Sequence, residues 1–183
     1  MGSFVSLGKK FPEFRKKAVV SIESGNEYSE ITSEDHIRQN KWMVIFWYPY
    51  DFSLVCPTEI IEFNKNYDEF RDRDAIVIGA STDSEYVHLA WRKEHSGLRS
   101  LRFPLIADTS KSLAEELGIL SDEKVAYRVT YIVDPKGIIR WISANDINTG
   151  RNIKEVIRVL DALQTDEKCP CNWEKGQPTL TVI

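Results

Sequence analysis

Cysteine, glycine and proline are scarce in this chain, and long apolar runs are missing. Three cysteines among 183 residues are too few, and odd in number, for a secreted scaffold held together by disulfides. Nine glycines and seven prolines exclude collagen-like and low-complexity sequences. The longest apolar run, residues 43–48, is far shorter than the roughly 20 residues that a membrane-spanning helix needs. We therefore expect neither a disulfide scaffold nor a protein embedded in a membrane.

A surplus of positive charge is missing as well. Lys and Arg total 24 against 28 Asp and Glu, which gives a net charge of −4. Nucleic acids and anionic membranes bind through clustered positive charge, so we expect neither as a main partner. Lys9 and Lys10 follow a short, broken apolar stretch that lacks the apolar core of a secretory signal. These features predict a cytoplasmic protein.

What the chain does contain is an alternation of strand and helix patterns within the length of one ordinary domain. Apolar segments at residues 42–48, 75–81, 103–107 and 128–133 indicate buried strands. Apolar spacing and capping residues predict helices over 57–71, from 85 onward, over 110–117 and over 153–163. Turn residues predict one hairpin of 17–22 with 27–32, and another of 128–133 with 138–144. This order predicts an α/β sandwich of the thioredoxin-like type. We expect a central mixed sheet flanked by helices, mostly parallel and with one antiparallel hairpin.

Cys56 lies between the first buried strand and the helix that follows it. The free N–H groups and the positive dipole end of a helix start both stabilise a thiolate. A buried and inert cysteine is the ordinary alternative. Against it, the flanking segment 50–53 is mixed in polarity, and a residue just before a helix is usually reachable from the surface. We therefore predict a reactive thiol.

A reductase of the thioredoxin type would carry Cys-x-x-Cys at this place, but residues 56–59 read Cys-Pro-Thr-Glu. Cys56 therefore needs a distant thiol, a small-molecule thiol, or no redox partner. Cys169 and Cys171 are the other thiols, 113 and 115 positions downstream. Half of a metal site is the main alternative for this pair. Zinc sites usually hold four ligands at short spacings, which the three histidines do not supply: His36, His88 and His95.

Two segments make the chain recognisable. Residues 46–60, FWYPYDFSLVCPTEI, resemble the peroxidatic segment of the typical two-cysteine peroxiredoxins, roughly F-Y-P-x-D-F-[TS]-F-V-C-P-T-E. Residues 169–173, CPCNW, resemble their resolving segment V-C-P-A-N-W. The resemblance extends from residues 8–14 to 178–180. It is closest to the AhpC branch, the peroxidase components of alkyl hydroperoxide reductases, in its mycobacterial form with C-x-C-N-W.

The resemblance implies a thioredoxin-like peroxidase domain over residues 1–164 and a resolving-cysteine tail over 165–183. It assigns Cys56 as the peroxidatic thiol, and Pro49, Ser53 and Arg128 as its catalytic partners. Glu59 matches a position that hydrogen-bonds the arginine. Taken singly, each partner has an ordinary alternative: Ser53 as a helix cap, Arg128 as a solvated strand residue, Pro49 as a strand terminator. Their joint spacing around Cys56 favours the catalytic interpretation.

The resemblance also implies partners. Cys169 of the other subunit would resolve the Cys56 sulfenic acid, with Cys171 as an auxiliary thiol that passes the disulfide on. The expected substrates are hydrogen peroxide, organic hydroperoxides and peroxynitrite, and the reductant is an AhpD-like or thioredoxin-like protein. We expect a homodimer that assembles into a ring and holds no metal or other cofactor. A thiol–disulfide oxidoreductase and a ring-shaped chaperone are the rival functions.

One departure from the family bears on inactivation. Relatives that overoxidise easily carry G-G-L-G and a C-terminal Tyr-Phe helix, whereas residues 95–99 here read HSGLR. No Tyr-Phe helix is expected in the C-terminal residues, which read Thr181-Val182-Ile183. A packed helix of that kind would slow the opening of the segment around Cys56. We therefore expect this chain to resist inactivation by excess hydrogen peroxide.

Overall fold

A computed structural model describes residues 5–181 of the chain. The chain divides into two compact units, Met1–Arg151 and Asn152–Ile183. Within residues 5–181, the first unit holds the strands and all helices but the last, and the second holds that helix and the segment after it. The predicted boundary between residues 164 and 165 stays a prediction.

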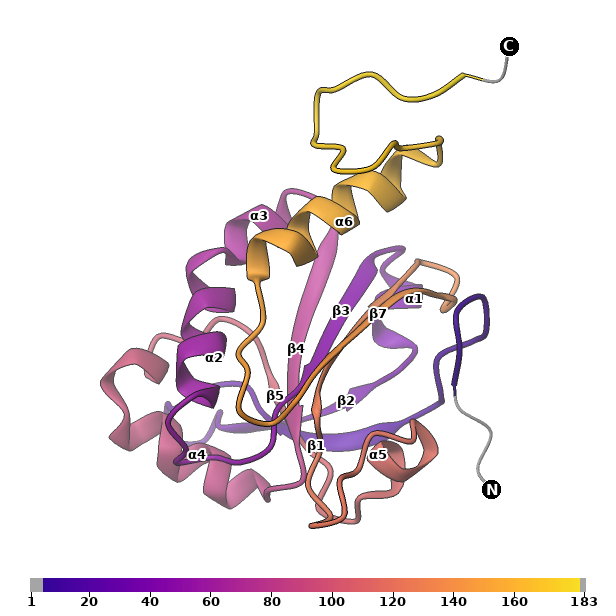
Figure 1. Cartoon of the computed structure of the whole chain (residues 1–183). Coiled ribbons are helices and arrows are strands. Elements are labelled where there is room, and N and C mark those ends of the chain that lie inside the picture. Colours follow the sequence, from indigo (N-terminus) through magenta and orange to yellow (C-terminus); the bar gives the residue numbers. More distant parts are fainter. Residues whose placement is uncertain (1–4, 182–183) are drawn as a thin grey trace. The chain divides into compact units, whose positions relative to one another are not determined.

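The first unit is built on one seven-stranded sheet with the order β2-β1-β5-β4-β3-β6-β7 (Figure 1). Its strands are β1 (Arg15–Val19), β2 (Tyr28–Thr32), β3 (Trp42–Trp47), β4 (Ala75–Ser81), β5 (Leu105–Ala107), β6 (Arg128–Val133) and β7 (Ile139–Asn145). The bounds of β4 and β6 agree with the predicted segments, because both strands are rich in apolar side chains and all but one of their residues are buried. β3 lies inside the sheet between β4 and β6, so the segment that follows it emerges between two neighbouring strands.

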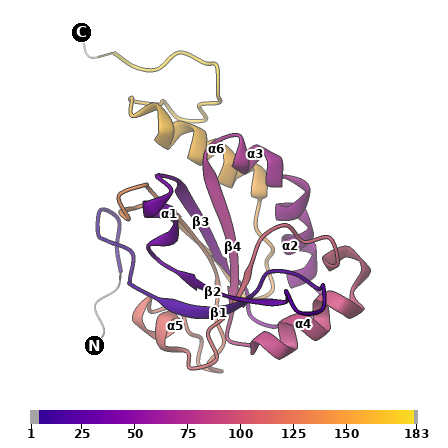
Figure 2. The same cartoon turned by 180° about the vertical axis from the view of Figure 1, so that it is seen from behind.

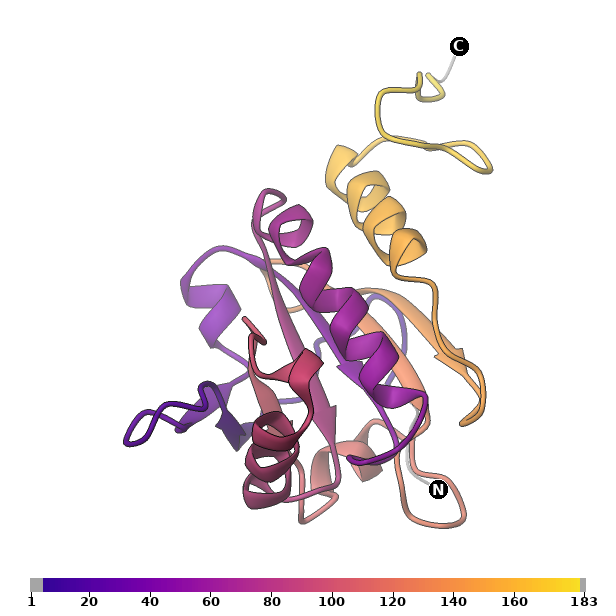
Figure 3. The same ribbon diagram turned by 90° about the vertical axis from the view of Figure 1, so that its left-hand side faces the viewer.

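Helices cover both faces of this sheet. They are α1 (Asp35–Arg38), α2 (Cys56–Lys65), α3 (Tyr67–Arg71), α4 (Glu85–Glu94), the 3₁₀ helix η1 (Ser96–Leu98) and α5 (Ser112–Glu116). Figure 3 shows α2 and α4 in front of the sheet, and Figure 2 shows α1 and α5 on the other side. Side chains along β3 point alternately to the two faces of the sheet. On one face, Phe46 stacks on Phe63 of α2 with 4.0 Å between ring centroids. Its neighbours Ile45 and Trp47 share a core with Leu113 of α5.

The prediction of a mostly parallel sheet is wrong. Only the β3–β4 and β4–β5 pairs are parallel, whereas β1–β2, β1–β5, β3–β6 and β6–β7 are antiparallel. The two parallel pairs are those whose connections contain helices, as parallel crossovers require. Both predicted hairpins are confirmed, with bounds that differ by one to three residues. The mixed sheet flanked by helices is of the thioredoxin-like type.

The helix predicted over residues 57–71 is one residue longer at its start and broken near its middle. It begins at Cys56, and Asn66 separates α2 from α3. The Asn66 side-chain amide donates to the Glu62 carbonyl at 2.9 Å. This local bond competes with the helical ladder, and a ψ of 13° at Asn66 ends the first helix. The short α1 and η1 were not predicted, because neither is long enough to show a hydrophobic period.

The second unit consists of α6 (Ile153–Thr165) and a closed loop. The Asn152 side chain caps α6 by accepting from the N–H groups of Lys154 and Glu155. The segment after α6 is irregular, as predicted, but it is not loose. The Leu180 N–H donates to the Lys168 carbonyl at 2.8 Å and closes the loop. Between residues 166 and 181 this loop contains no helix; residues 182–183 lie outside the described part.

Two contacts tie this loop to α6. Arg158 Nη1 donates to the Trp173 carbonyl at 2.9 Å, and Lys175 pairs with Asp161 at 3.4 Å. The Trp173 side chain is buried, and its indole N–H donates to the Gln177 carbonyl at 3.0 Å.

Among residues 5–181, no helix combines the length and the apolar character needed to cross a membrane.

Candidate active site

Cys56 is the first residue of α2 and follows the segment that leaves β3. Val55 is the N-cap, no side chain caps the helix, and Pro57 occupies its first turn. The N–H groups of this turn and the positive helix end therefore face the cysteine region. The expectation that Cys56 is reachable from the surface is wrong, because its exposed fraction is 0%. Any reaction with a large partner requires this helix start to open.

Arg128 lies beside the Cys56 sulfur. It begins β6, the neighbour of β3, and its side chain crosses to the face that carries α2. Arg128 Nη1 is 3.3 Å from Cys56 Sγ and donates to Glu59 Oε2 at 2.6 Å. Arg128 Nε donates to the Ile147 carbonyl at 2.7 Å, which fixes the plane of the guanidinium. With 3% exposure, Arg128 is not an ordinary solvated strand residue.

Glu59 joins Arg128 to a second buried arginine, Arg151. Glu59 Oε1 accepts from the backbone N–H and Nε of Arg151, both at 2.9 Å, and Oε2 accepts from Nη2 at 3.0 Å. Arg151 Nη2 also donates to the Trp47 carbonyl at 2.6 Å. Burial lowers the pKa of Arg151, and the charge and hydrogen bond of Glu59 oppose that shift. Two guanidiniums and one carboxylate leave one positive charge, which a Cys56 thiolate would balance.

Sequence reasoning did not assign a role to Arg151. The residue lies in the segment 150–152 that resembles the mycobacterial branch, and this resemblance was the available signal. Its place after β7 gives no hydrophobic or capping pattern that would point to the site. Only the fold brings it within hydrogen-bond distance of a residue 92 positions away.

Ser53 and Pro49 belong to the segment between β3 and α2. Pro49 is buried, next to the end of β3, and Ser53 is half-buried. The Ser53 hydroxyl donates to the Tyr50 carbonyl at 2.9 Å. Ser53 does not cap α2, since the N-cap is Val55 and no side chain fills that role.

Cys169 and Cys171 lie in the second unit, in the loop after α6. Cys169 is half-buried and Cys171 is exposed, and neither forms a disulfide. Cys169 Sγ is 3.4 Å from Thr165 Oγ1 and 3.8 Å from the Ala162 carbonyl. In the part of the chain that the structure describes, no group of three or more His, Cys, Asp or Glu residues could hold a metal ion.

A buried polar cluster around Asp51 was not predicted. Asp51 Oδ2 is 2.6 Å from Nδ1 of His88, whose ring is fully buried. The Tyr48 hydroxyl donates to Asp51 Oδ1 at 2.9 Å. Burial raises the pKa of Tyr48 well above its usual value, which keeps its proton on the hydroxyl. The cluster lies at the base of the segment that leads to Cys56.

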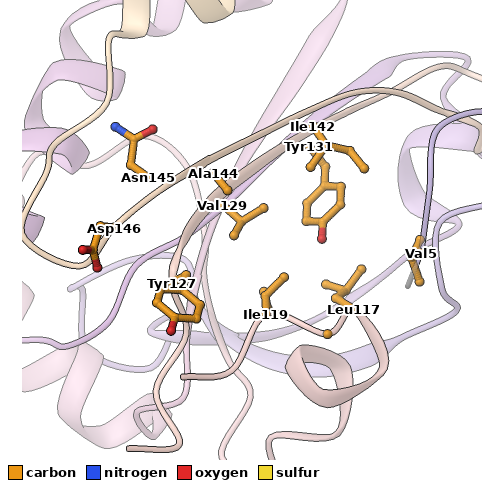
Figure 4. A pocket seen from close by; sticks show the side chains of 11 residues that line it. Val5, Leu117, Ile119, Tyr127, Val129, Tyr131, Ile142, Ala144, Asn145 and Asp146 are labelled. Carbon is orange, nitrogen blue, oxygen red and sulfur yellow. The ribbon is translucent and has the colours of Figure 1, made fainter. Parts of the chain in front are cut away.

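A cavity of about 570 Å³ lies on the opposite face of β6. Val129 and Tyr131 line it, together with Leu117 and Ile119 (Figure 4). Successive residues of a strand point to opposite faces, so these side chains point away from the face that holds Arg128. The cavity is therefore not the pocket of Cys56.

A buried cysteine at a helix start, paired with an arginine on a central strand of a thioredoxin-like sheet, is an arrangement of the peroxiredoxin class. The AhpC/TSA family model matches residues 7–142, and the chain belongs to this family.

The most similar curated relatives include alkyl hydroperoxide reductase C of Mycobacterium tuberculosis, which is 45% identical over 96% of this chain and 93% of its own. Putative peroxiredoxin YkuU of Bacillus subtilis is 44% identical over 95% of this chain and 97% of its own. Among solved structures, Mycobacterium bovis AhpC matches with a TM-score of 0.86 and 43% identity, covering 94% of this chain and 99% of that one. Plasmodium vivax 2-Cys peroxiredoxin in its reduced form matches with a TM-score of 0.85 and 33% identity, covering 94% of this chain and 91% of that one. The predicted AhpC resemblance and thioredoxin-like fold are confirmed.

Proposed function

We propose that this chain is a thiol-dependent peroxidase that reduces hydrogen peroxide, organic hydroperoxides and peroxynitrite at Cys56. The observation that carries the proposal is the 3.3 Å contact between Arg128 Nη1 and Cys56 Sγ in a fully buried site. A fixed positive charge at this distance stabilises a thiolate and the charge that develops on peroxide oxygens. The names of the relatives, alkyl hydroperoxide reductase C and peroxiredoxin, support the same activity.

The first step transfers one oxygen to sulfur. The Cys56 thiolate attacks the terminal oxygen of the peroxide, so an S–O bond forms as the O–O bond breaks. The sulfur loses two electrons and becomes sulfenic acid. The leaving alkoxide or hydroxide takes up a proton and departs as an alcohol or water, and peroxynitrite releases nitrite in the same way. Arg128 stabilises the charge, while Pro49, which has no N–H to compete for the sulfur, shields it from water.

The second step removes the sulfenic acid. A tail thiol attacks the Cys56 sulfur, an S–S bond forms, and water leaves. We assign Cys169 of a partner subunit to this attack and Cys171 to the exchange that follows. The exposure of Cys171 supports its role as the thiol that meets the reductant. A resolving thiol in a separate compact unit is consistent with a homodimer that assembles into a ring.

The reductant in this proposal is an AhpD-like or thioredoxin-like disulfide protein. The 39% identical relative from Echinococcus granulosus is named thioredoxin peroxidase, and the mycobacterial relatives favour the AhpD type. Both proteins work in a reducing compartment, which fits the predicted cytoplasmic location and a role in antioxidant defence and redox homeostasis. Insulin reduction distinguishes the rival thiol–disulfide oxidoreductase, because a peroxidase without Cys-x-x-Cys has little of that activity.

A peroxide-consumption assay with AhpD, thioredoxin and glutaredoxin systems side by side tests the proposal. Wild type should turn over both hydrogen peroxide and an organic hydroperoxide with at least one system, and Cys56→Ser with none. Cys171→Ser separates the two steps: it should keep oxidation of Cys56 and the first disulfide, but weaken reduction by an AhpD-like partner. Full turnover in Cys56→Ser would end the peroxidase proposal.

A further inference from the structure

His88 on α4 is a fully buried histidine whose two ring nitrogens both face hydrogen-bond acceptors. Nδ1 is 2.6 Å from Asp51 Oδ2, and Nε2 is 3.1 Å from the Ile106 carbonyl. A neutral imidazole carries one N–H and a carboxylate carries none. These two contacts therefore require one additional proton, held between the ring and Asp51. The His88–Asp51 contact is a short hydrogen bond around a shared proton in a site without water exposure.

Asp51 is the point through which this contact acts on the active site. It lies in the segment of residues 49–55 that joins β3 to α2. Its backbone N–H donates to Asp83 Oδ2 at 2.9 Å, and Asp83 in turn accepts from the Ser81 hydroxyl at 2.9 Å. The next residue, Phe52, has a φ of 57°, a left-handed conformation that costs energy for a side-chain-bearing residue. The contacts of Asp51 hold this strained segment in place.

We propose that His88 is a positioning residue for Cys56: by sharing a proton with Asp51, it holds segment 49–55 and the first turn of α2 closed. Loss of that proton leaves a neutral ring that can donate to only one of its two acceptors. The contact with Asp51 is then no longer charge-assisted, so it weakens and the segment opens more readily. The inference rests on the proposed function in one respect. Opening matters because a buried Cys56 sulfenic acid can meet a tail thiol only when the helix start unwinds.

The charges around His88 all favour the proton-sharing state. Asp51 and Tyr48 face the ring from the segment and from the end of β3, Asp83 faces it from the turn before α4, and Glu85 lies on α4 itself. Glu85 is paired with Lys17 of β1 at 3.1 Å, and β5 contributes only the Ile106 carbonyl. Burial disfavours the charged ring, but the hydrogen bond and charge of Asp51 outweigh it and raise the pKa of His88.

This direction fixes the sign of the pH dependence. A group whose pKa is raised by folding stabilises the folded arrangement fully below its unfolded pKa, about 6.5 for histidine. That contribution is lost as the pH rises through the higher pKa of the folded state. The closed segment should therefore loosen at alkaline pH, and the tail thiols should then compete better against a second molecule of peroxide.

Hydrogen exchange on the reduced full-length chain tests the inference without peroxide. Protection of residues 50–56, corrected for intrinsic exchange, is measured between pH 6 and pH 9, with amides of β3 as the reference for global opening. In wild type we expect protection of the segment to fall about tenfold or more relative to β3, the size of a charge-assisted hydrogen bond. The two proposals can fail separately. A negative exchange result does not contradict peroxidase activity, and full turnover in Cys56→Ser does not contradict the exchange result.

Two variants separate the shared proton from mere packing. In Asp51→Asn, the side-chain amide can donate to Nδ1 of a neutral His88, so the segment should stay protected with a flat pH profile. In His88→Gln the profile should be flat as well, at lower protection. His36→Gln is the matched control: His36 is buried as well, and its Nε2 contacts a backbone carbonyl, that of Asp134, outside segment 49–55, so the wild-type profile should persist. A flat wild-type profile, or an unchanged profile in Asp51→Asn, would overturn the inference.

Discussion

Replacing Glu59 with Gln should strongly destabilise the fold. Glu59 accepts four hydrogen bonds from Arg128 and Arg151, and all three side chains are at most 5% exposed. Glutamine keeps one acceptor oxygen but turns an N–H₂ group toward guanidinium donors. Two buried positive charges then lack their carboxylate. Removing one partner of a buried ion pair costs about 3–5 kcal/mol.

Thermal and urea unfolding at equal protein concentration measure this cost. At roughly 2–4 °C per kcal/mol for a chain of this size, the melting temperature of Glu59→Gln should fall by roughly 6–20 °C. Glu155→Gln is the matched control, because Glu155 also pairs with an arginine, Arg158, but is 45% exposed. An exposed pair contributes at most about 1 kcal/mol. Equal losses in the two variants would refute the reasoning from burial.

Three further predictions concern the reaction cycle. Arg128→Ala should slow oxidation of Cys56 by roughly 100- to 1,000-fold, the usual loss when a donor to a developing oxyanion is removed; stopped-flow fluorescence measures this, and a rate within twofold of wild type would contradict it. Protein oxidised with one equivalent of peroxide should run as a disulfide-linked dimer on a non-reducing gel, whereas a strictly intramolecular disulfide in peptide maps would exclude resolution across subunits. The double variant Cys169→Ser/Cys171→Ser should accumulate Cys56 sulfinic acid much faster than wild type in mass spectra after a peroxide pulse; equal rates would mean that neither tail thiol resolves Cys56.

Much of the fold could be predicted because its elements carry local signals. β4 and β6 are rich in apolar residues, Ser84 caps α4 by accepting from the Val87 N–H, and the turn before β7 contains Pro and Gly. Strand direction carries no comparable signal. It depends on which strand each element pairs with, and β6 lies antiparallel to β3 although about 80 residues separate them. The proportion of parallel pairs was therefore predicted wrongly.

Some residues of the candidate site could likewise be predicted from the sequence, and others could not. Cys56 and its neighbours stand out in the sequence because they form one continuous segment, 49–59. Burial of Cys56 is a property of packing, and the sequence alone suggested the opposite. Arg151 reaches Glu59 across 92 positions, and His88 reaches Asp51 across 37. No spacing rule connects such pairs, since the sheet order alone determines which distant residues meet.

Trapping of the oxidised sulfur tests the central claim, that Cys56 is the thiol that attacks peroxide. The variant Cys169→Ser/Cys171→Ser, in which Cys56 is the only thiol, is mixed with one equivalent of hydrogen peroxide in the presence of dimedone. Intact-mass and peptide mass spectrometry then locate the adduct. We predict nearly complete labelling of Cys56, and a strong loss of labelling when Arg128→Ala is added. Consumption of peroxide without an adduct on Cys56 would contradict the mechanism.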